Sequence, residues 1–418
     1  MKLKRHHLVG ALLGLKGNPR GCVFAEPLWG VPYNLYAPYA SVFMVALGLA
    51  DRQIGLIMSV SLGLQVVFSL VSGAVTDKLG RRRTTLIFDI VAWSGSALLS
   101  ALSRNFWCFL AAGMVNSVWR ITQNSWTCLL VEDADPEELS DIYAWIYIAN
   151  VVVGFAAPLA GLLIESFELE RTVRGLYFFA AAMFTIKAIV TFLFTKETAR
   201  GEIRKEETKG KSLLSILGGY GGVLKAMLAS PRTLYVGALM LAINVTQMVS
   251  GTFLAILATQ KLGIPADRIS IFPFVRSAVV IAIFFLATRA IVKLRFKVPL
   301  TLGFVGYAAS QLIYVLAPSG GYAFLIAGTV LEACSFAVAN PMTDRLLAHN
   351  VDPGDRARTQ SLLYVGVIVL STPFGWIAGS LSQIDKAYPL VLNLALYALG
   401  ALVAYFAGRE AERAEAAA

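Results

Sequence analysis

Four charged residues stand within long apolar stretches of this sequence: Glu26, Arg120, Arg276 and Glu332. An ionised side chain in such a place is costly unless it is paired or hydrated, so each is a candidate for function. A carboxyl group in a partly dry cleft can bind and release a proton near neutral pH, and a guanidinium can bind an anionic group. The residue types therefore predict proton binding at Glu332, with Glu26 as an alternative that could also reach water, and a charged binding site at Arg120 and Arg276.

The composition identifies the medium around these charges. Of 418 residues, 57% are hydrophobic and only 15% are charged, and the mean hydropathy is +0.67, whereas soluble domains carry about 25% charged residues. A helix needs roughly 20 apolar residues to cross about 30 Å of hydrocarbon. Such runs predict an all-α, polytopic membrane protein with twelve spans, near residues 21–48, 53–76, 84–103, 106–131, 139–165, 174–195, 233–259, 268–288, 298–317, 321–343, 360–381 and 388–407.

The net charge of +10 follows from the expected membrane topology. With both termini placed in the cytoplasm, 26 of the 36 Lys and Arg residues lie in inside segments, 7 in outside loops and 3 within spans. This distribution obeys the positive-inside rule and argues against a nucleic-acid partner. We therefore expect a monomeric, multi-pass protein of the plasma membrane with cytoplasmic N- and C-termini, whose partners are the bilayer and a small-molecule substrate.

The two halves of the chain repeat each other. The segment 47–55 matches 262–270, and 109–115 matches 324–330, both with a shift of 215 residues. Two such six-helix units facing one another leave a polar cleft near the middle of the membrane, and rocking of one unit against the other gives alternating access. The predicted parts are a lead-in (1–20), an N-terminal six-helix bundle (21–195), a linker with an amphipathic helix (196–232), a C-terminal six-helix bundle (233–408) and a tail (409–418).

A short basic segment between the second and third predicted spans contains a recognisable motif. Residues 73–83 read GAVTDKLGRRR, in which Gly73 could allow a close helix approach and Gly80 a sharp turn. The segment resembles motif A of the major facilitator superfamily, which the chain resembles along nearly its whole length, in particular its twelve-helix drug and proton antiporter branch. The matching position of the second half, 288–297, keeps the basic charge but lacks the aspartate and glycine.

The resemblance implies a conformational latch built on Asp77. In the family, this aspartate contacts the start of helix eleven and an arginine of the same loop, here Arg81, together with an acid at the end of helix four. The matching acid is either Glu132 or Asp133. Topology alone explains the remaining basic residues of the loop, Lys78, Arg82 and Arg83.

Arg120 lies on a polar stripe in the predicted fourth span. Helical spacing places Asn116, Arg120 and Gln123 on one face. The sequence RITQN at 120–124 resembles motif B of the same superfamily, Arg-x-x-Gln-Gly, with Asn124 in place of the glycine. The resemblance implies that Arg120 lines the central cavity and takes part in proton coupling; structural pairing of Arg120 with an acid is the alternative.

Other polar residues would complete the pathway. Glu332 shares a helical stripe with Ser335, Ala339 and Thr343. Aromatic and amide side chains on spans that line the cleft in this fold are further candidates for the substrate and proton pathway, namely Tyr33, Tyr36, Tyr147, Asn150, Asn244 and Gln247.

The fifth predicted span contains a second family-like segment. Residues 154–161 read GFAAPLAG and resemble motif C of the drug and proton antiporters, although Ala157 replaces the glycine before the proline and Leu162 replaces the last glycine. The segment favours export, and close packing of helices through small residues explains it equally well.

Two further charged residues and the absence of several motifs limit the functions that the sequence predicts. Asp89 and Lys187 lie at equal depth in spans three and six, which predicts a structural ion pair. The four cysteines have no CxxC spacing, the three histidines form no catalytic pattern, and no Walker motif is found in the sequence. We therefore expect no enzyme, no metal and no cofactor, and an ion gradient, carried by protons, as the energy source.

The sequence predicts a secondary active transporter that works by alternating access. The first hypothesis is proton-coupled export of small amphipathic molecules. The alternative is a proton- or gradient-coupled importer of a sugar or an organic anion, in which Arg120 and Arg276 bind the anionic group. A non-transporting membrane sensor is the third hypothesis.

Overall fold

The computed structural model describes residues 14–135, 137–209, 231–286, 294–350 and 356–417. Within these ranges all regular secondary structure is helical. The chain forms two compact units, of which unit 1 comprises Met1–Ala37, Leu64–Ala157 and Glu170–Gly218, and unit 2 comprises Pro38–Gly63, Pro158–Leu169 and Gly219–Ala418.

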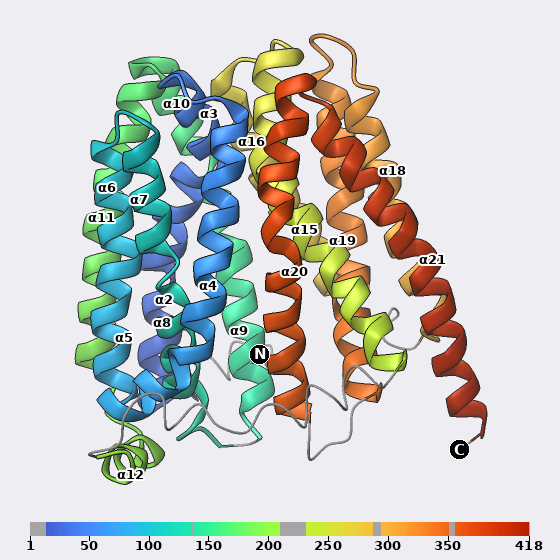
Figure 1. The fold of residues 1–418 in the computed structure, drawn as a ribbon. Coiled ribbons are helices and arrows are strands. Elements are labelled where there is room, and N and C mark those ends of the chain that lie inside the picture. The colour runs from blue at the N-terminus through green and yellow to red at the C-terminus, as the bar shows by residue number, and fades with distance from the viewer. Residues whose placement is uncertain (1–13, 136, 210–230, 287–293, 351–355, 418) are drawn as a thin grey trace, which may run out of the picture. The chain divides into compact units, whose positions relative to one another are not determined.

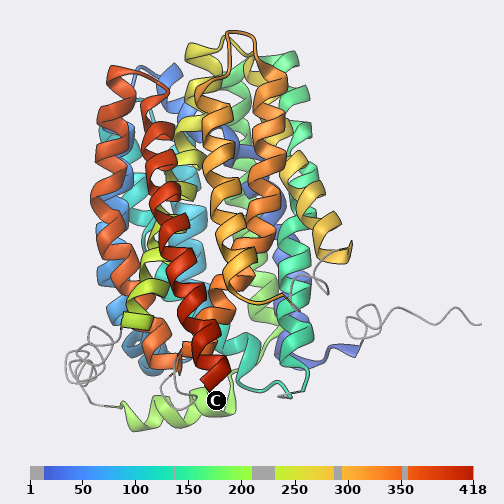
Figure 2. The same ribbon diagram turned by 90° about the vertical axis from the view of Figure 1, so that its right-hand side faces the viewer.

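Unit 1 is built mainly from helices of the first half of the chain. In Figure 1, α5 and α6 follow one another in one column, α7 lies beside α6, and α12 lies across the end nearer α5; Figure 2 also shows α12 at this end. Its helices are α2 (Gly17–Tyr36), the later part of α4 (Asp51–Leu79), α5 (Arg81–Asp89), the π-helical η2 (Ile90–Gly95), α6 (Ser96–Leu102), α7 (Phe106–Asn116), α8 (Trp119–Val131), α9 (Leu139–Val152), η3 (Val153–Ala156), α11 (Leu169–Phe194) and α12 (Ala199–Glu207).

Unit 2 contains the helices of the second half and short pieces of the first. Its core packs α15, α18, α19 and α21 around buried aromatic rings; those of Tyr307 and Tyr397 stack with centroids 4.4 Å apart. Its elements are η1 (Ala37–Tyr39), α3 (Ala40–Ala46), the first part of α4, α10 (Pro158–Phe167), α15 (Pro231–Ile256), η4 (Leu257–Lys261), η5 (Ala266–Ser270), α16 (Ile271–Leu286), α18 (Lys297–Val315), α19 (Tyr322–Asn350), α20 (Arg356–Ile384) and α21 (Tyr388–Ala417).

Ten helices of the described residues are long and apolar enough to cross a membrane. Large apolar side chains remain on the surface, such as Trp107 at 72% exposure and Phe194 at 70%. A bilayer solvates such a surface, while helices satisfy their own backbone hydrogen bonds. The protein is therefore a multi-pass membrane protein of helices.

Two of the twelve predicted spans are not among the ten helices long enough to cross a membrane, which corrects the sequence-based boundaries. The span expected at 21–48 is divided into α2, η1 and α3, and Pro38, which lacks an amide hydrogen, lies at the division. The span expected at 106–131 stops at Asn116 and resumes at Trp119. At this break the Ser117 hydroxyl donates to the Gly113 carbonyl at 2.8 Å, a local bond that competes with the helical ladder.

A close crossing of α4 and α20 fixes one region of unit 2. A Cβ atom added at Gly55 would overlap the carbonyl oxygen of Gly375, and one added at Gly379 would lie 2.6 Å from the carbonyl oxygen of Asp51. One helical turn along α4, the Ser59 hydroxyl oxygen accepts a hydrogen bond from the Trp376 amide at 2.8 Å. The two helices therefore touch backbone to backbone, which only residues without side chains allow.

We predict that Gly55→Val destabilises the protein by about 1–3 kcal/mol, because the added side chain forces α4 and α20 apart. Gly63→Val on the same helix is the matched control, since a Cβ at Gly63 would meet only the Thr372 methyl group at 3.7 Å. Thermal unfolding of the purified protein in detergent measures both. Equal stability of the two variants would contradict this crossing.

Candidate functional site

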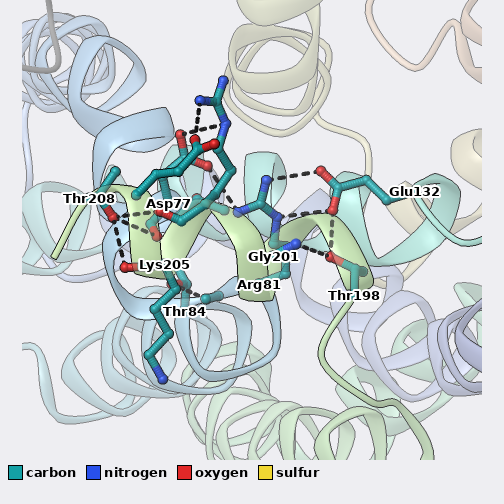
Figure 3. A network of polar contacts seen from close by, with 12 residues as sticks. Asp77, Arg81, Thr84, Glu132, Thr198, Gly201, Lys205 and Thr208 are labelled. Atoms are coloured by element: carbon teal, nitrogen blue, oxygen red, sulfur yellow. Dashed lines mark hydrogen bonds and ion pairs between the residues drawn. The ribbon is translucent and has the colours of Figure 1, made fainter.

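Arg81 is the centre of a polar network at one end of unit 1 (Figure 3). Its Nε donates to Oε2 of Glu132 and its Nη2 donates to Oε1 of Glu132, both at 3.0 Å. Its Nη1 donates to Oδ1 of Asp77 at 2.9 Å. Only 4% of the Arg81 side chain is exposed. Bidentate binding of this kind fixes the direction as well as the distance of the pair, so Arg81 ties the end of α4 to the end of α8.

Gly80 makes the turn into this network possible. Its φ of +85° is strained for other residues, and an added Cβ would lie 2.5 Å from Oε2 of Glu197. The Glu197 carboxylate accepts hydrogen bonds from the backbone amides of Arg81 at 2.8 Å and Arg82 at 3.2 Å. These amides belong to the first turn of α5, where a helix leaves its N–H groups unsatisfied.

Helix α12 closes the network from the other side, as Figure 3 shows. The Thr198 side chain caps α12 by accepting from the Gly201 amide at 2.9 Å and donates to Oε2 of Glu132 at 2.5 Å. At the other end of α12, the Thr208 hydroxyl donates to the Asp77 carbonyl at 3.2 Å. The expected linker thus contributes an ordered helix that holds both acids of the latch, while residues 210–230 lie outside the described part of the chain.

The structure distinguishes among the predicted latch residues. Glu132 contacts Arg81, whereas Asp133 accepts from the Asn18 amide at 3.4 Å and the Ala199 amide at 3.3 Å. Within unit 1 an added Cβ at Gly73 would meet nothing within 4 Å, so the close helix approach expected there is not found in this unit. Asp77 is also expected to contact the start of helix eleven. The segment that leads into that helix, 351–355, lies outside the described residues, so this contact stays a prediction.

Glu132 lies just past α8, and its surroundings favour the ionised form. Burial alone would raise the pKa of its carboxyl group, but hydrogen bonds from Arg81 and Thr198 and the charge of Arg81 outweigh burial. The pKa of Glu132 is therefore held below its ordinary value.

Arg120 is held by amides and an aromatic ring in unit 1. Its Nε donates to Gln65 Oε1 at 3.1 Å, its Nη1 donates to Gln123 Oε1 at 2.9 Å, and its guanidinium lies 4.1 Å from the centroid of the Trp119 ring. Gln123 is exposed. Two amide oxygens and the Trp119 ring thus orient the guanidinium, whose planar set of donors matches the oxygens of an anionic group.

Aromatic rings continue from Trp119 into a cluster. The Trp119 and Trp93 centroids are 6.1 Å apart, those of Trp93 and Trp29 are 5.0 Å apart, and Trp29 stacks on Tyr33 at 4.8 Å. Tyr36 extends the cluster towards α11, with its ring 4.5 Å from that of Tyr177. Rings from four helices of unit 1 therefore lie beside the predicted cavity residue Arg120.

Asn116 does not share the stripe predicted for Arg120, and Asn124, the residue in place of the motif glycine, also binds a neighbouring helix. The Asn116 amide donates to the Ala92 carbonyl at 3.1 Å and the Ser96 hydroxyl at 3.3 Å, and the Asn124 amide donates to the Thr76 hydroxyl at 3.2 Å. The stripe assumed one continuous helix, and the break after Asn116 disrupts it. Both asparagines join neighbouring helices.

Unit 2 contains the other predicted site residues. The Tyr314 hydroxyl donates to Oε2 of Glu332 at 2.9 Å, and Glu332 is 7% exposed. The Arg276 guanidinium lies 4.7 Å from the Phe336 ring centroid. Asn244 accepts from the Ser371 hydroxyl at 3.1 Å, and Nε2 of Gln247 is buried with no hydrogen-bond partner among the described residues.

The structure brings Asp89 and Lys187 together in unit 1. Nζ of Lys187 lies 2.6 Å from Oδ2 of Asp89, whose Oδ1 accepts from the Thr122 hydroxyl at 2.8 Å. Glu26 and the Asn150 amide lie nearby, within hydrogen-bonding reach of each other. Tyr147, one turn before Asn150 in α9, is half-buried.

Sequence reasoning missed several of these partners. Gln65 gave a usable signal, since it is the only polar side chain in the run 62–68. Tyr314 gave none, because tyrosines in spans are also common as interfacial anchors. Glu197 and Thr198 lie in a polar stretch that reads as a plain linker. Among the described residues, no group of three or more His, Cys, Asp or Glu residues could hold a metal ion.

Comparisons with known proteins agree on the fold. Residues 30–325 match the family described as Major Facilitator Superfamily, and the chain matches no curated protein by sequence. It is similar to the crystal structure of the nucleoside transporter NupG, with a TM-score of 0.70, 14% identity, and 95% of this chain and 99% of that chain covered. A bacterial homologue of the human lysosomal transporter Spinster gives 0.68, 16%, 97% and 98%, and the human organic anion transporter MFSD10 gives 0.59, 19%, 95% and 98%.

We predict that Arg81→Gln destabilises the protein by about 3 kcal/mol, near the lower end for breaking a buried pair, because Asp77 and Glu132 keep some contact with water. Arg83→Gln, which changes an exposed arginine two residues away, is the control and should have little effect. Chemical unfolding in detergent compares the two. Equal effects would mean that charge alone, and no specific pairing, matters in this segment.

The lowered pKa of Glu132 predicts a pH dependence with a definite sign. Its stabilising contribution is complete above the ordinary pKa of glutamate, about 4.3, and is lost as the pH falls through the lower pKa of the folded state. The stability difference between the wild type and Glu132→Gln should therefore shrink on acidification, as measured by melting temperature. Glu138→Gln, which changes an exposed glutamate, should show no such trend.

Proposed function

Because the chain belongs to the Major Facilitator Superfamily, we propose that it exports small amphipathic molecules in exchange for protons. The family and the transporter structures that the chain resembles make it a secondary transporter rather than an enzyme. What remains to be proposed is the substrate class, the coupling ion and the direction.

The arrangement around Arg120 is the observation that supports an amphipathic substrate. A guanidinium held by Gln65 and Gln123 offers polar recognition, and it stacks on Trp119 at the edge of an aromatic cluster. Ring pairs with centroids 4.8–6.1 Å apart, one stacked, one edge-on and one tilted, provide apolar contact area. A molecule with one aromatic or apolar part and one polar or anionic group matches both halves of this arrangement.

Glu332 is the proposed proton-binding residue of this site. It is a carboxyl group in the membrane-spanning helix α19, and the Tyr314 hydroxyl donates to it. A group of this kind is costly as an isolated anion, so binding and release of a proton can be coupled to a change in its surroundings. Arg276 in α16, which lies over Phe336, supplies positive charge in the same unit.

The direction of export rests on the motif C-like segment. Gly161 in α10 packs so closely on η5 of unit 2 that an added Cβ would overlap the Asp267 carbonyl oxygen and lie 2.6 Å from the Ser270 hydroxyl. This crossing gives the segment a structural role at a point where a larger residue would not fit. The close packing is the structural explanation of the segment, so the proposed direction depends on the motif alone. We place the transporter in the plasma membrane as a monomer with both termini in the cytoplasm.

Import of an organic anion or a nucleoside is the second candidate. The observation that favours it is again Arg120, whose charge suits an anionic group. The named transporters of similar fold include a nucleoside transporter and an organic anion transporter. These names describe those proteins, and at identities of 14% and 19% the likeness to this chain is one of fold.

We predict that Arg120→Gln weakens ligand binding about 10- to 100-fold, since a hydrogen bond to a charged group contributes about 1.5–3 kcal/mol. A thermal-shift screen of amphipathic compounds on the purified protein identifies the ligand, because binding to the folded state raises stability. Arg104→Gln, at an exposed arginine, is the control. A ligand that shifts the wild type and both variants equally would place the binding site elsewhere.

The direction is tested in vesicles with the identified ligand. If the protein exports in exchange for protons, ligand added to inverted vesicles should dissipate an imposed pH gradient, and Glu332→Gln should abolish this flux. Uptake into right-side-out vesicles driven by an inward proton gradient would instead establish import. Ligand movement that is indifferent to the proton gradient would contradict proton coupling in either direction.

A further inference from the structure

Three charged side chains meet in the interior of unit 1, away from both Arg120 and the latch. Glu26 of α2, Asp89 of α5 and Lys187 of α11 are 9%, 2% and 6% exposed. Asp89 and Lys187 form an ion pair of 2.6 Å. Glu26 lies between two contacts that bring α2 against the same part of unit 1: a Cβ added at Gly21 would lie 2.8 Å from the Phe194 carbonyl oxygen, and the Trp29 and Trp93 ring centroids are 5.0 Å apart. Two carboxyl groups thus share one ammonium group.

In the described part of the chain, the other side chains recorded around this cluster are uncharged. Cys22, one turn before Glu26 in α2, is fully buried against the same groups. Helix α8 contributes the Thr122 hydroxyl and the Trp126 ring, whose centroid lies 5.9 Å from Nζ of Lys187. Helix α9 contributes the Asn150 amide.

The net charge of these three side chains implies that the cluster binds a positive ligand. With both carboxyl groups ionised, the cluster would hold one uncompensated negative charge in a place that water barely reaches. An isolated buried charge costs far more than a hydrogen bond returns, so such groups are neutralised instead. A proton on one carboxyl group balances the cluster.

The two carboxyl groups are not equivalent. Both oxygens of Asp89 receive strong donors, the Lys187 ammonium at 2.6 Å and the Thr122 hydroxyl at 2.8 Å, which favour the carboxylate. Among the described residues, the donor near Glu26 is the neutral amide of Asn150, which also donates to the Ile146 carbonyl at 3.0 Å. The proton therefore belongs on Glu26.

We propose that Glu26 is a second proton-binding site of this transporter, and that the Asp89–Lys187 pair is its positioning pair rather than a purely structural contact. The inference rests on the proposed proton coupling and adds a site in unit 1 to Glu332 in unit 2. The backbone supports a functional role here, because the π-helical segment η2 begins at Ile90, directly after Asp89. Helical segments of this kind occur frequently at functional sites.

Infrared spectroscopy tests the site directly and without a ligand. A protonated carboxyl group absorbs at a different frequency from a carboxylate. The full-length protein in detergent at neutral pH should show the band of a protonated carboxyl group, to which Glu26 contributes. Glu26→Gln should remove this contribution. Asp89→Asn should also remove it although Glu26 is still present, because an ionised Glu26 and the Lys187 ammonium then balance each other and no proton is needed. Lys187→Met should increase the band, since a second proton is then needed.

Matched controls separate this site from the rest of the molecule. Glu165→Gln changes an exposed glutamate and should leave the band unchanged, and Glu332→Gln reports the separate site in unit 2. Unfolding curves identify any variant that fails to fold, and the three cluster variants give independent readings. A band that Glu26→Gln and Asp89→Asn both leave intact would overturn the proposal. Absence of ligand-driven proton flux in vesicles would instead overturn the proposed function, so the two failures are distinguishable.

Discussion

The cost of an ionised group in a hydrocarbon environment is the constraint on which the rest of this structure depends. Three charged residues are paired with a residue from another segment: Arg81 with Glu132 at the end of α8, Lys187 with Asp89, and Asp51 of α4 with Lys386 between α20 and α21 at 2.5 Å. Because the partners belong to different segments, each pair also fixes how two segments pack. The positions where charge is tolerated are therefore the positions where the helical packing is most specific.

Glycines and short polar side chains allow these charged groups to reach their hydrogen-bond donors. At Gly80 the backbone turns with a positive φ, and the space that a side chain would fill is occupied by the Glu197 carboxylate. At the crossing of α4 and α20, contact of the backbones at Gly55 brings the Ser382 hydroxyl within 2.6 Å of the buried Asp51 carboxylate. In both places a missing side chain allows an ionised group to reach its donors, so glycine acts here as part of the electrostatics.

Residue type and depth predicted more of the site than periodicity did. Motif A indicated the Arg81 contact with an acid at the end of helix four, but the choice of Glu132 over Asp133 depends on how α8 ends. Equal depth and opposite charge brought Asp89 and Lys187 into one prediction. Periodicity in an apolar run carries no signal for a break such as the one at Ser117, because both pieces remain apolar. Glu197 lies 116 residues from Arg81, and Tyr314 lies on a different helix from Glu332, so only the fold brings these partners together.

Charge balance separates two kinds of buried polar cluster in this protein. Asp51 and Lys386 are matched one to one, and the Ser382 hydroxyl takes up remaining acceptor capacity, so this cluster is complete without a further ligand. The cluster of Glu26, Asp89 and Lys187 has one carboxyl group too many, and its surroundings among the described residues offer an amide, a hydroxyl, a thiol and an indole ring but no second cation. A balanced cluster is satisfied in one arrangement of the helices, whereas an unbalanced one is satisfied only while it holds a proton. Proton loss then favours any arrangement that hydrates Glu26, which is the physical link that coupling requires.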